Sequence, residues 1–331
     1  MRPGWVARRP LLLGLGAAAL AGRASAQGGS AEAWPARTVR IVVGFAPGGP
    51  SDTYARLLAP ELQAIWGQPV VVENRAGANG VIGTEAVARA DPDGTTLLST
   101  ATNHTMNAAA YAHLPYDTIG SFAPVCLTAT APTVLVVNPG RVPAQDLQGF
   151  VAFARAHPGE VSYATSGAGG AGHFAGEMFK TRAMLDMPHI PYRGTAPAVQ
   201  DLIAGNVAAS FATLTTVLTV IKAGRLRAIA VAMRERVPLL PDTPTFEEGG
   251  YPGFEADVWY GILAPARTPA PLVARIARDI QSIQAKPAFR KALAEQASLP
   301  AVAGPEEFAA LIRREVPQWM AVAREAHITV E

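Results

Sequence analysis

Short runs rich in Val, Ile and Leu alternate along this chain with segments of helical length and pattern. The first such runs are residues 38–45, 70–73 and 95–100. This alternation is typical of βαβ units, and it predicts a parallel sheet with crossover helices. The same rhythm returns later and predicts a second α/β unit, with strands at residues 134–137, 161–165, 189–192, 207–211 and 226–232.

No linker rich in Gly, Ser or Pro separates the two units. Residues 122–138 are instead almost continuously apolar or small, which predicts a long strand that crosses from one unit to the other, and residues 226–233 are the expected return crossing. We therefore expect a discontinuous lobe 1, residues 27–129 plus 233–331, and a lobe 2, residues 130–232. Two apolar faces near the C-terminus predict helices that complete lobe 1, one with Leu272, Ile276, Ile280 and Ile283, and one that begins at Pro305.

The N-terminus has the pattern of an export signal. Arg2, Arg8 and Arg9 precede an apolar run from Leu11 to Ala21, and Ala24-Ser25-Ala26 follows as a cleavage site. The run is too short to span a bilayer, which needs about 20 apolar residues. The sequence predicts a signal peptide at residues 1–26 and a periplasmic mature protein, with ordinary secretion and twin-arginine export both open as routes.

Charge and cysteine content exclude several classes of protein. The chain has 28 basic and 26 acidic residues, and four of the arginines precede residue 27, which leaves 24 basic residues. A mature net charge near −2 gives no electrostatic footprint for nucleic acid or for an anionic membrane. The single cysteine, Cys126, has no partner for an internal disulfide and is expected to be a small buried residue.

A glycine-rich turn follows the first predicted strand and precedes a helical segment. It contains Gly48, Gly49, Ser51 and Asp52. Glycine amides can approach a ligand closely, and the first turn of a helix presents unpaired N–H groups to an anion. The turn is therefore a candidate carboxylate cradle, although Ser51 or Asp52 could instead cap the helix.

A second turn, after residues 161–165, contains Ser166, Gly167 and Ala168. Gly167, Gly169 and Gly172 form a literal G-x-G-x-x-G, which suggests a dinucleotide site. The motif lies outside the first βαβ unit, and no acidic residue stands about 20 positions later, which weakens that interpretation. The same amides would serve a carboxylate equally well.

A third turn, after residues 189–192, contains Gly194, Thr195 and Ala196 and opens another helical segment. Arg193 could pair with an anion there or remain solvated. Thr100, Asn103 and His104 follow the third predicted strand and could reach a cleft, although His104 could equally make a structural hydrogen bond. Ligands of open α/β sheets bind at such strand ends.

Metal, cofactor and hydrolase chemistry receive little support. The six histidines show no metal-ligand spacing, and we expect no metal and no cofactor. The chain contains no G-x-S-x-G nucleophile elbow. A secreted NAD(P)-type oxidoreductase remains the main alternative function, and a secreted hydrolase is a weaker one.

Several stretches together carry a resemblance to a known family. They are residues 34–49, 68–75, 91–98, 114–117, 121–125, 189–198, 221–228 and 240–245. In order and spacing, the mature chain resembles the Bug-type periplasmic receptors of tripartite tricarboxylate transporters. The resemblance implies a two-lobed type II periplasmic-binding-protein clamshell that closes over a carboxylate ligand and delivers it to separate membrane subunits, without catalysis. We expect a monomer.

The resemblance also implies ligand loops at residues 48–52, 100–104, 166–168 and 194–196. It implies an Asp-Asn pair after residues 207–211, where this chain has Ala212 and Thr213. We include Thr213 among the candidate ligand contacts. Without the Asp carboxylate, we expect the site to disfavour ligands that carry an amino group.

Overall fold

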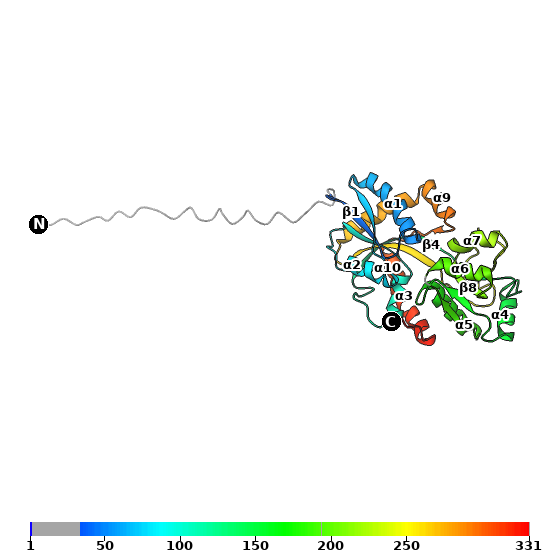
Figure 1. Cartoon of the computed structure of the whole chain (residues 1–331). Coiled ribbons are helices and arrows are strands. Elements are labelled where there is room, and N and C mark those ends of the chain that lie inside the picture. The colour runs from blue at the N-terminus through cyan, green and yellow to red at the C-terminus, as the bar shows by residue number, and fades with distance from the viewer. Residues whose placement is uncertain (2–33, 193, 331) are drawn as a thin grey trace. The chain divides into compact units, whose positions relative to one another are not determined.

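Residues from Pro35 onward fold around two β-sheets with flanking helices. The computed structural model describes Met1, residues 34–192 and residues 194–330 (Figure 1). The predicted signal peptide and Arg193 therefore lie outside the described residues.

The first sheet has the strand order β11-β4-β10-β3-β1-β2. Strands β1 (Val39–Val43), β2 (Val70–Asn74) and β3 (Thr96–Ala101) run parallel, as the alternation predicts. Strand β10 (Val258–Pro265) is antiparallel to both β3 and β4 (Phe122–Ala131), and the short β11 (Leu299–Pro300) pairs with β4. The sheet is thus mixed, because its last strands come from the C-terminal part of the chain.

Helices pack against this first sheet. The N-terminal part of the chain contributes α1 (Pro50–Trp66), the 3-10 turn η2 (Ala78–Gly80), α2 (Val81–Ala88) and α3 (Asn103–Ala110). The C-terminal part adds α8 (Ala270–Gln284), α9 (Pro287–Glu295) and α10 (Pro305–Glu325). The predicted apolar face of α8 is confirmed, since Leu272, Ile276, Ile280 and Ile283 are all buried. Helix α10 begins at Pro305, as predicted.

The second sheet has the order β7-β6-β8-β5-β9. Its strands are β5 (Thr133–Val137), β6 (Tyr163–Thr165), β7 (His189–Pro191), β8 (Ala209–Thr213) and β9 (Arg227–Val231). Its helices are α4 (Leu147–Ala156), α5 (Ala171–Ala183), α6 (Thr195–Ala204) and α7 (Leu214–Lys222), drawn in green in Figure 1. A two-sheet α/β fold is confirmed.

The crossing between the sheets differs from the single long strand that the sequence predicts. Strand β4 ends at Ala131 in the first sheet, and β5 begins at Thr133 in the second, with Pro132 between them. Proline lacks the N–H that a ladder needs, so a strand interrupted there can change sheets. Two strands therefore replace the predicted one.

The return path is longer than the predicted crossing. Residues 232–257 lie between β9 and β10, and within them Phe246 and Phe254 are buried in the apolar cluster that also contains Phe211 of β8. This packing attaches the segment to the second sheet. The lobe boundaries at 129/130 and 232/233 stay a prediction.

Candidate functional site

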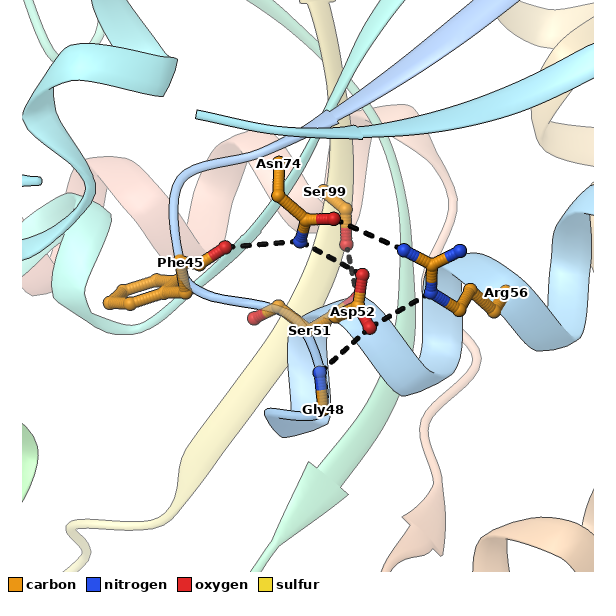
Figure 2. A network of polar contacts seen from close by, with 7 residues as sticks. All are labelled: Phe45, Gly48, Ser51, Asp52, Arg56, Asn74 and Ser99. Carbon is orange, nitrogen blue, oxygen red and sulfur yellow. Dashed lines mark hydrogen bonds and ion pairs between the residues drawn. The ribbon is translucent and has the colours of Figure 1, made fainter. Parts of the chain in front are cut away.

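The loop after β1 is held by a network of polar contacts centred on Asp52. Its carboxylate accepts hydrogen bonds from the Gly48 N–H, from Arg56 Nε and from Asn74 Nδ2, each at 2.9 Å (Figure 2). Asn74 Nδ2 also donates to the Phe45 carbonyl at 3.0 Å. These bonds join the loop to α1 and to β2, so the carboxylate fixes the path of the backbone.

Asp52 is only 2% exposed, and its charge is well compensated. The hydrogen bond from Arg56, with those from Gly48 and Asn74, lowers the pKa of the carboxyl group to about 2. Asp52 is therefore ionised at neutral pH, and the Gly48 N–H already has an acceptor. In this arrangement both residues shape the cradle, and neither Asp52 nor the Gly48 N–H is free to hold an anion.

The start of α1 keeps unpaired amides beyond this network. Gly49 is the N-cap, Pro50 has no N–H, and the amides of Ser51 and Asp52 have no acceptor within the helix. Ser99 Oγ donates to the Ser51 carbonyl at 3.1 Å, which fastens the first turn to β3 (Figure 2). Thr100, on the same strand, is buried.

The residues that follow β3 are engaged in packing. Asn103 Nδ2 donates to the Asn79 carbonyl at 2.8 Å. His104 is 1% exposed, and its Nε2 lies 2.9 Å from the Thr118 carbonyl, with Tyr116 and Phe122 against its ring. Burial lowers the pKa of His104 to about 4, so the ring is neutral at neutral pH. A side chain enclosed in this way has no direct access to a ligand from solvent.

The second sheet carries a pocket of about 70 Å³ at the ends of its strands. Three predicted site residues from different turns, Ser166, Thr195 and Thr213, line it together. Ala212 lines it as well. Gly172 of the G-x-G-x-x-G pattern also lines it. Six further lining residues were not predicted, namely Thr133, Ala171, Ala198, Val199, Ser210 and Phe211.

Some of the missed residues left a signal in the sequence. Thr133 and Ser210 are hydroxyl residues within otherwise apolar strand segments, and in the structure both are buried. A buried polar residue in such a segment needs a hydrogen-bonding partner, so its presence indicates a structural contact or a binding site. The apolar lining residues left none, because Ala and Val are ordinary there.

Three helices begin at this pocket. Helix α5 begins after its N-cap Gly170, α6 after Gly194 and α7 after Thr213. Residues from the first turn or the cap of each helix, Ala171, Thr195 and Thr213, line the pocket. Helix starts carry partial positive charge and N–H groups without intrahelical partners, so the pocket is suited to an anion.

Two glycines of the G-x-G-x-x-G pattern, Gly169 and Gly172, have packing roles. A Cβ at Gly172 would collide with the Phe211 carbonyl oxygen, and one at Gly169 would press on the Val330 side chain. Gly169 also has a φ of +70°, which disfavours any side chain. The close approach of α5 to β8 therefore explains why position 172 is a glycine. Gly167 and Ala168 belong to the same turn but do not line the pocket, and neither do Gly194 and Ala196 of the α6 turn.

Among the residues that the structure describes, no ionisable side chain lines this pocket. Behind the Ser166 turn, His173 and His189 stack with ring centroids 3.9 Å apart, and burial lowers the pKa of both, that of His189 to about 3. His173 Nδ1 accepts from the Gly169 N–H at 3.1 Å, so a neutral imidazole helps to hold this turn. Among the described residues, no group of three or more His, Cys, Asp or Glu side chains could hold a metal ion.

Comparison with known proteins identifies the family. The family model described as "Tripartite tricarboxylate transporter family receptor" matches residues 54–328. The chain belongs to this receptor family. BugT of Bordetella pertussis is 38% identical to the receptor over 298 residues, which are 89% of this chain and 91% of BugT.

Solved structures agree with this assignment. The periplasmic binding protein BugD is 35% identical to the receptor, with a TM-score of 0.77, and the match covers 90% of this chain and all of BugD. A protein of R. palustris solved with adipate is 32% identical, with a TM-score of 0.80, over 90% of this chain and all of that one. The two sheets of the receptor therefore correspond to the periplasmic-binding-protein fold, as the resemblance implies.

Proposed function

We propose that this receptor captures a small organic carboxylate in the periplasm and delivers it to the membrane subunits of a tripartite tricarboxylate transporter, without catalysing a reaction. The observation that supports this most is the second-sheet pocket, where three helices begin around hydroxyl side chains and none of the described lining residues is ionisable. Such a site stabilises negative charge through main-chain dipoles. Its described lining supplies no charged side chain for acid–base catalysis.

Helix dipoles alone do not provide receptor-like affinity. A micromolar Kd corresponds to about 8 kcal/mol, and each helix start contributes about 0.3–2 kcal/mol toward an anion. The rest must come from enclosing the ligand, which excludes water and strengthens each hydrogen bond. We propose that the two lobes, with boundaries near 129/130 and 232/233, close over the ligand and that the loops of the first sheet at residues 48–52 and 100–104 face it.

The pocket also favours one ligand class. The related protein solved with adipate supports a dicarboxylate. Since no acidic side chain among the described residues lines the pocket, the ammonium group of an amino acid would lose its hydration there without gaining a counter-charge. We therefore expect dicarboxylates to bind more tightly than amino acids of similar length.

Periplasmic action requires export and release from the membrane. The predicted signal peptide at residues 1–26 supports export, and the related BugD is a periplasmic binding protein. In the part of the chain that the structure describes, every helix is too short or too polar to cross a bilayer. We propose that the mature receptor acts as a periplasmic monomer.

Isothermal titration calorimetry of the mature protein tests the proposal. The panel contains adipate, malate, succinate, citrate, benzoate, aspartate and glutamate. We expect at least one dicarboxylate or tricarboxylate to bind with a Kd of about 1 µM, and aspartate and glutamate to bind more weakly. Absence of heat with every acid in the panel would contradict carboxylate binding, and a bound chromophore in the absorbance spectrum would favour a cofactor-dependent enzyme instead.

A further inference from the structure

Thr133 is a pocket residue whose hydroxyl group has no partner. The side chain is 1% exposed, it stands at the start of β5, and it lines the second-sheet pocket. Its Oγ1 makes no hydrogen bond to any residue that the structure describes. Leaving a buried hydroxyl unpaired costs about 1–3 kcal/mol, so such a group calls for a partner from outside the polypeptide.

Neighbouring hydroxyl groups in the pocket differ from Thr133 in this respect. Ser210 Oγ donates to the Ala164 carbonyl at 2.8 Å, so its proton is already used within the sheet. Thr213, which stands directly opposite Thr133 in the β5–β8 register, accepts from Thr215 Oγ1 at 3.1 Å. Of the pocket hydroxyls on the paired strands β5 and β8, Thr133 is thus the one without a hydrogen-bond partner among the described residues.

The surroundings of Thr133 define which kind of group could form a hydrogen bond with its hydroxyl. Paired residues on adjacent antiparallel strands project to the same face, so Thr133 and Thr213 share one side of the sheet. The pocket there is small, at about 70 Å³, and three helices begin beside it. A partner must therefore be compact and hydrogen-bonding, and the helix starts favour one that carries negative charge.

We propose that Thr133 is a specificity-determining residue that donates its hydroxyl proton to an oxygen of the bound ligand. The inference rests on the proposed function and adds to it the chemical group of the ligand that the receptor recognises. The end of the ligand that enters the second-sheet pocket carries a carboxylate or hydroxyl oxygen, and an acid with a methyl group at that end is rejected because it leaves Thr133 unpaired.

The test uses Thr133→Val and Thr133→Ser, titrated with whichever acid of the calorimetric panel binds most tightly to the wild type. Valine keeps the shape of threonine and the strand propensity but removes the hydroxyl. A lost hydrogen bond to a charged group weakens binding by about 10- to 100-fold. We expect that loss for Thr133→Val, and for Thr133→Ser an affinity within about threefold of the wild type. The melting temperature of the ligand-free Thr133→Val protein should be equal to or above that of the wild type, because no bond is lost without ligand.

Thr268→Val is the matched control. Thr268 is also a buried threonine whose Oγ1 has no partner in the described structure, but it lies outside this pocket. Its substitution should leave the Kd unchanged.

If Thr133→Val binds the acid as tightly as the wild type, the assignment is wrong. A lower melting temperature of ligand-free Thr133→Val with an unchanged Kd would assign the hydroxyl to a structural water. If the wild type binds no acid of the panel, the proposed function itself fails.

Discussion

His104 illustrates how burial decides the role of a single polar residue. Its place after β3 makes it a candidate for a ligand cleft, yet the aromatic rings of Tyr116 and Phe122 enclose it, and its Nε2 faces the Thr118 carbonyl. Asp52 is similar, because its carboxylate binds the Gly48 amide, Arg56 and Asn74. Both are polar residues near a proposed site that stabilise the protein framework, and we leave both out of the direct ligand contacts.

The burial of His104 predicts a pH dependence of stability. Its pKa falls from 6.5 to about 4 in the folded protein, so between these values the unfolded chain binds a proton that the folded chain does not. The free energy of unfolding should therefore decrease as pH falls through this window, with a His104 share of about 3 kcal/mol at 1.36 kcal/mol per pKa unit.

Urea unfolding of wild type and His104→Gln at pH 7, 6, 5 and 4 measures this share. Glutamine does not titrate, so the variant should lose less stability over the same range. His113→Gln is the control, since His113 is exposed, and it should follow the wild type. Equal pH slopes for wild type and His104→Gln would contradict a buried neutral imidazole at position 104.

At the scale of secondary-structure elements, the strand and helix positions follow from patterns that the sequence displays. Apolar runs mark β1, β2, β3, β5, β6, β7, β8 and β9, and the turns after three of them predict that helices follow, which are α1, α5 and α6. The break at Pro132 and the pocket contacts of Thr133 and Ser210 were not predicted. Such features depend on which strands become neighbours, here β5 beside β8, and no local pattern in the sequence encodes that pairing.

The close contact of α5 with β8 can be tested by substitution of Gly172. Gly172→Ala places a Cβ against the Phe211 carbonyl oxygen and must move the helix away from the strand. Overpacking of this kind costs about 1–3 kcal/mol. We expect a lower melting temperature and weaker carboxylate binding, because both elements line the pocket. Thr181→Ala, at an exposed position of the same helix, is the control for thermal melting and calorimetry. Unchanged stability of Gly172→Ala would show that α5 and β8 are not in close contact.

Across the compact unit from Pro35 onward, the turn that carries Ser166 is linked to elements of the first sheet. The Val330 N–H donates to the Ala110 carbonyl at 2.8 Å, at the end of α3, and the Val330 side chain packs beside Gly169. Asn79 Nδ2 lies 3.4 Å from the Gly169 carbonyl. Helix α10 contacts both α3 and α5. These contacts attach the Ser166 turn to α3 and to the 3-10 turn η2.

We infer that main-chain amides at helix starts hold the carboxylate of the ligand. Amide chemical-shift mapping of ¹⁵N-labelled mature receptor, titrated with its tightest-binding acid, tests it most directly. We expect the largest shifts to include the amides of Gly172, Thr195 and Leu214, at the starts of α5, α6 and α7. Saturating binding that leaves those three amides unshifted would show that the helix starts do not hold the ligand.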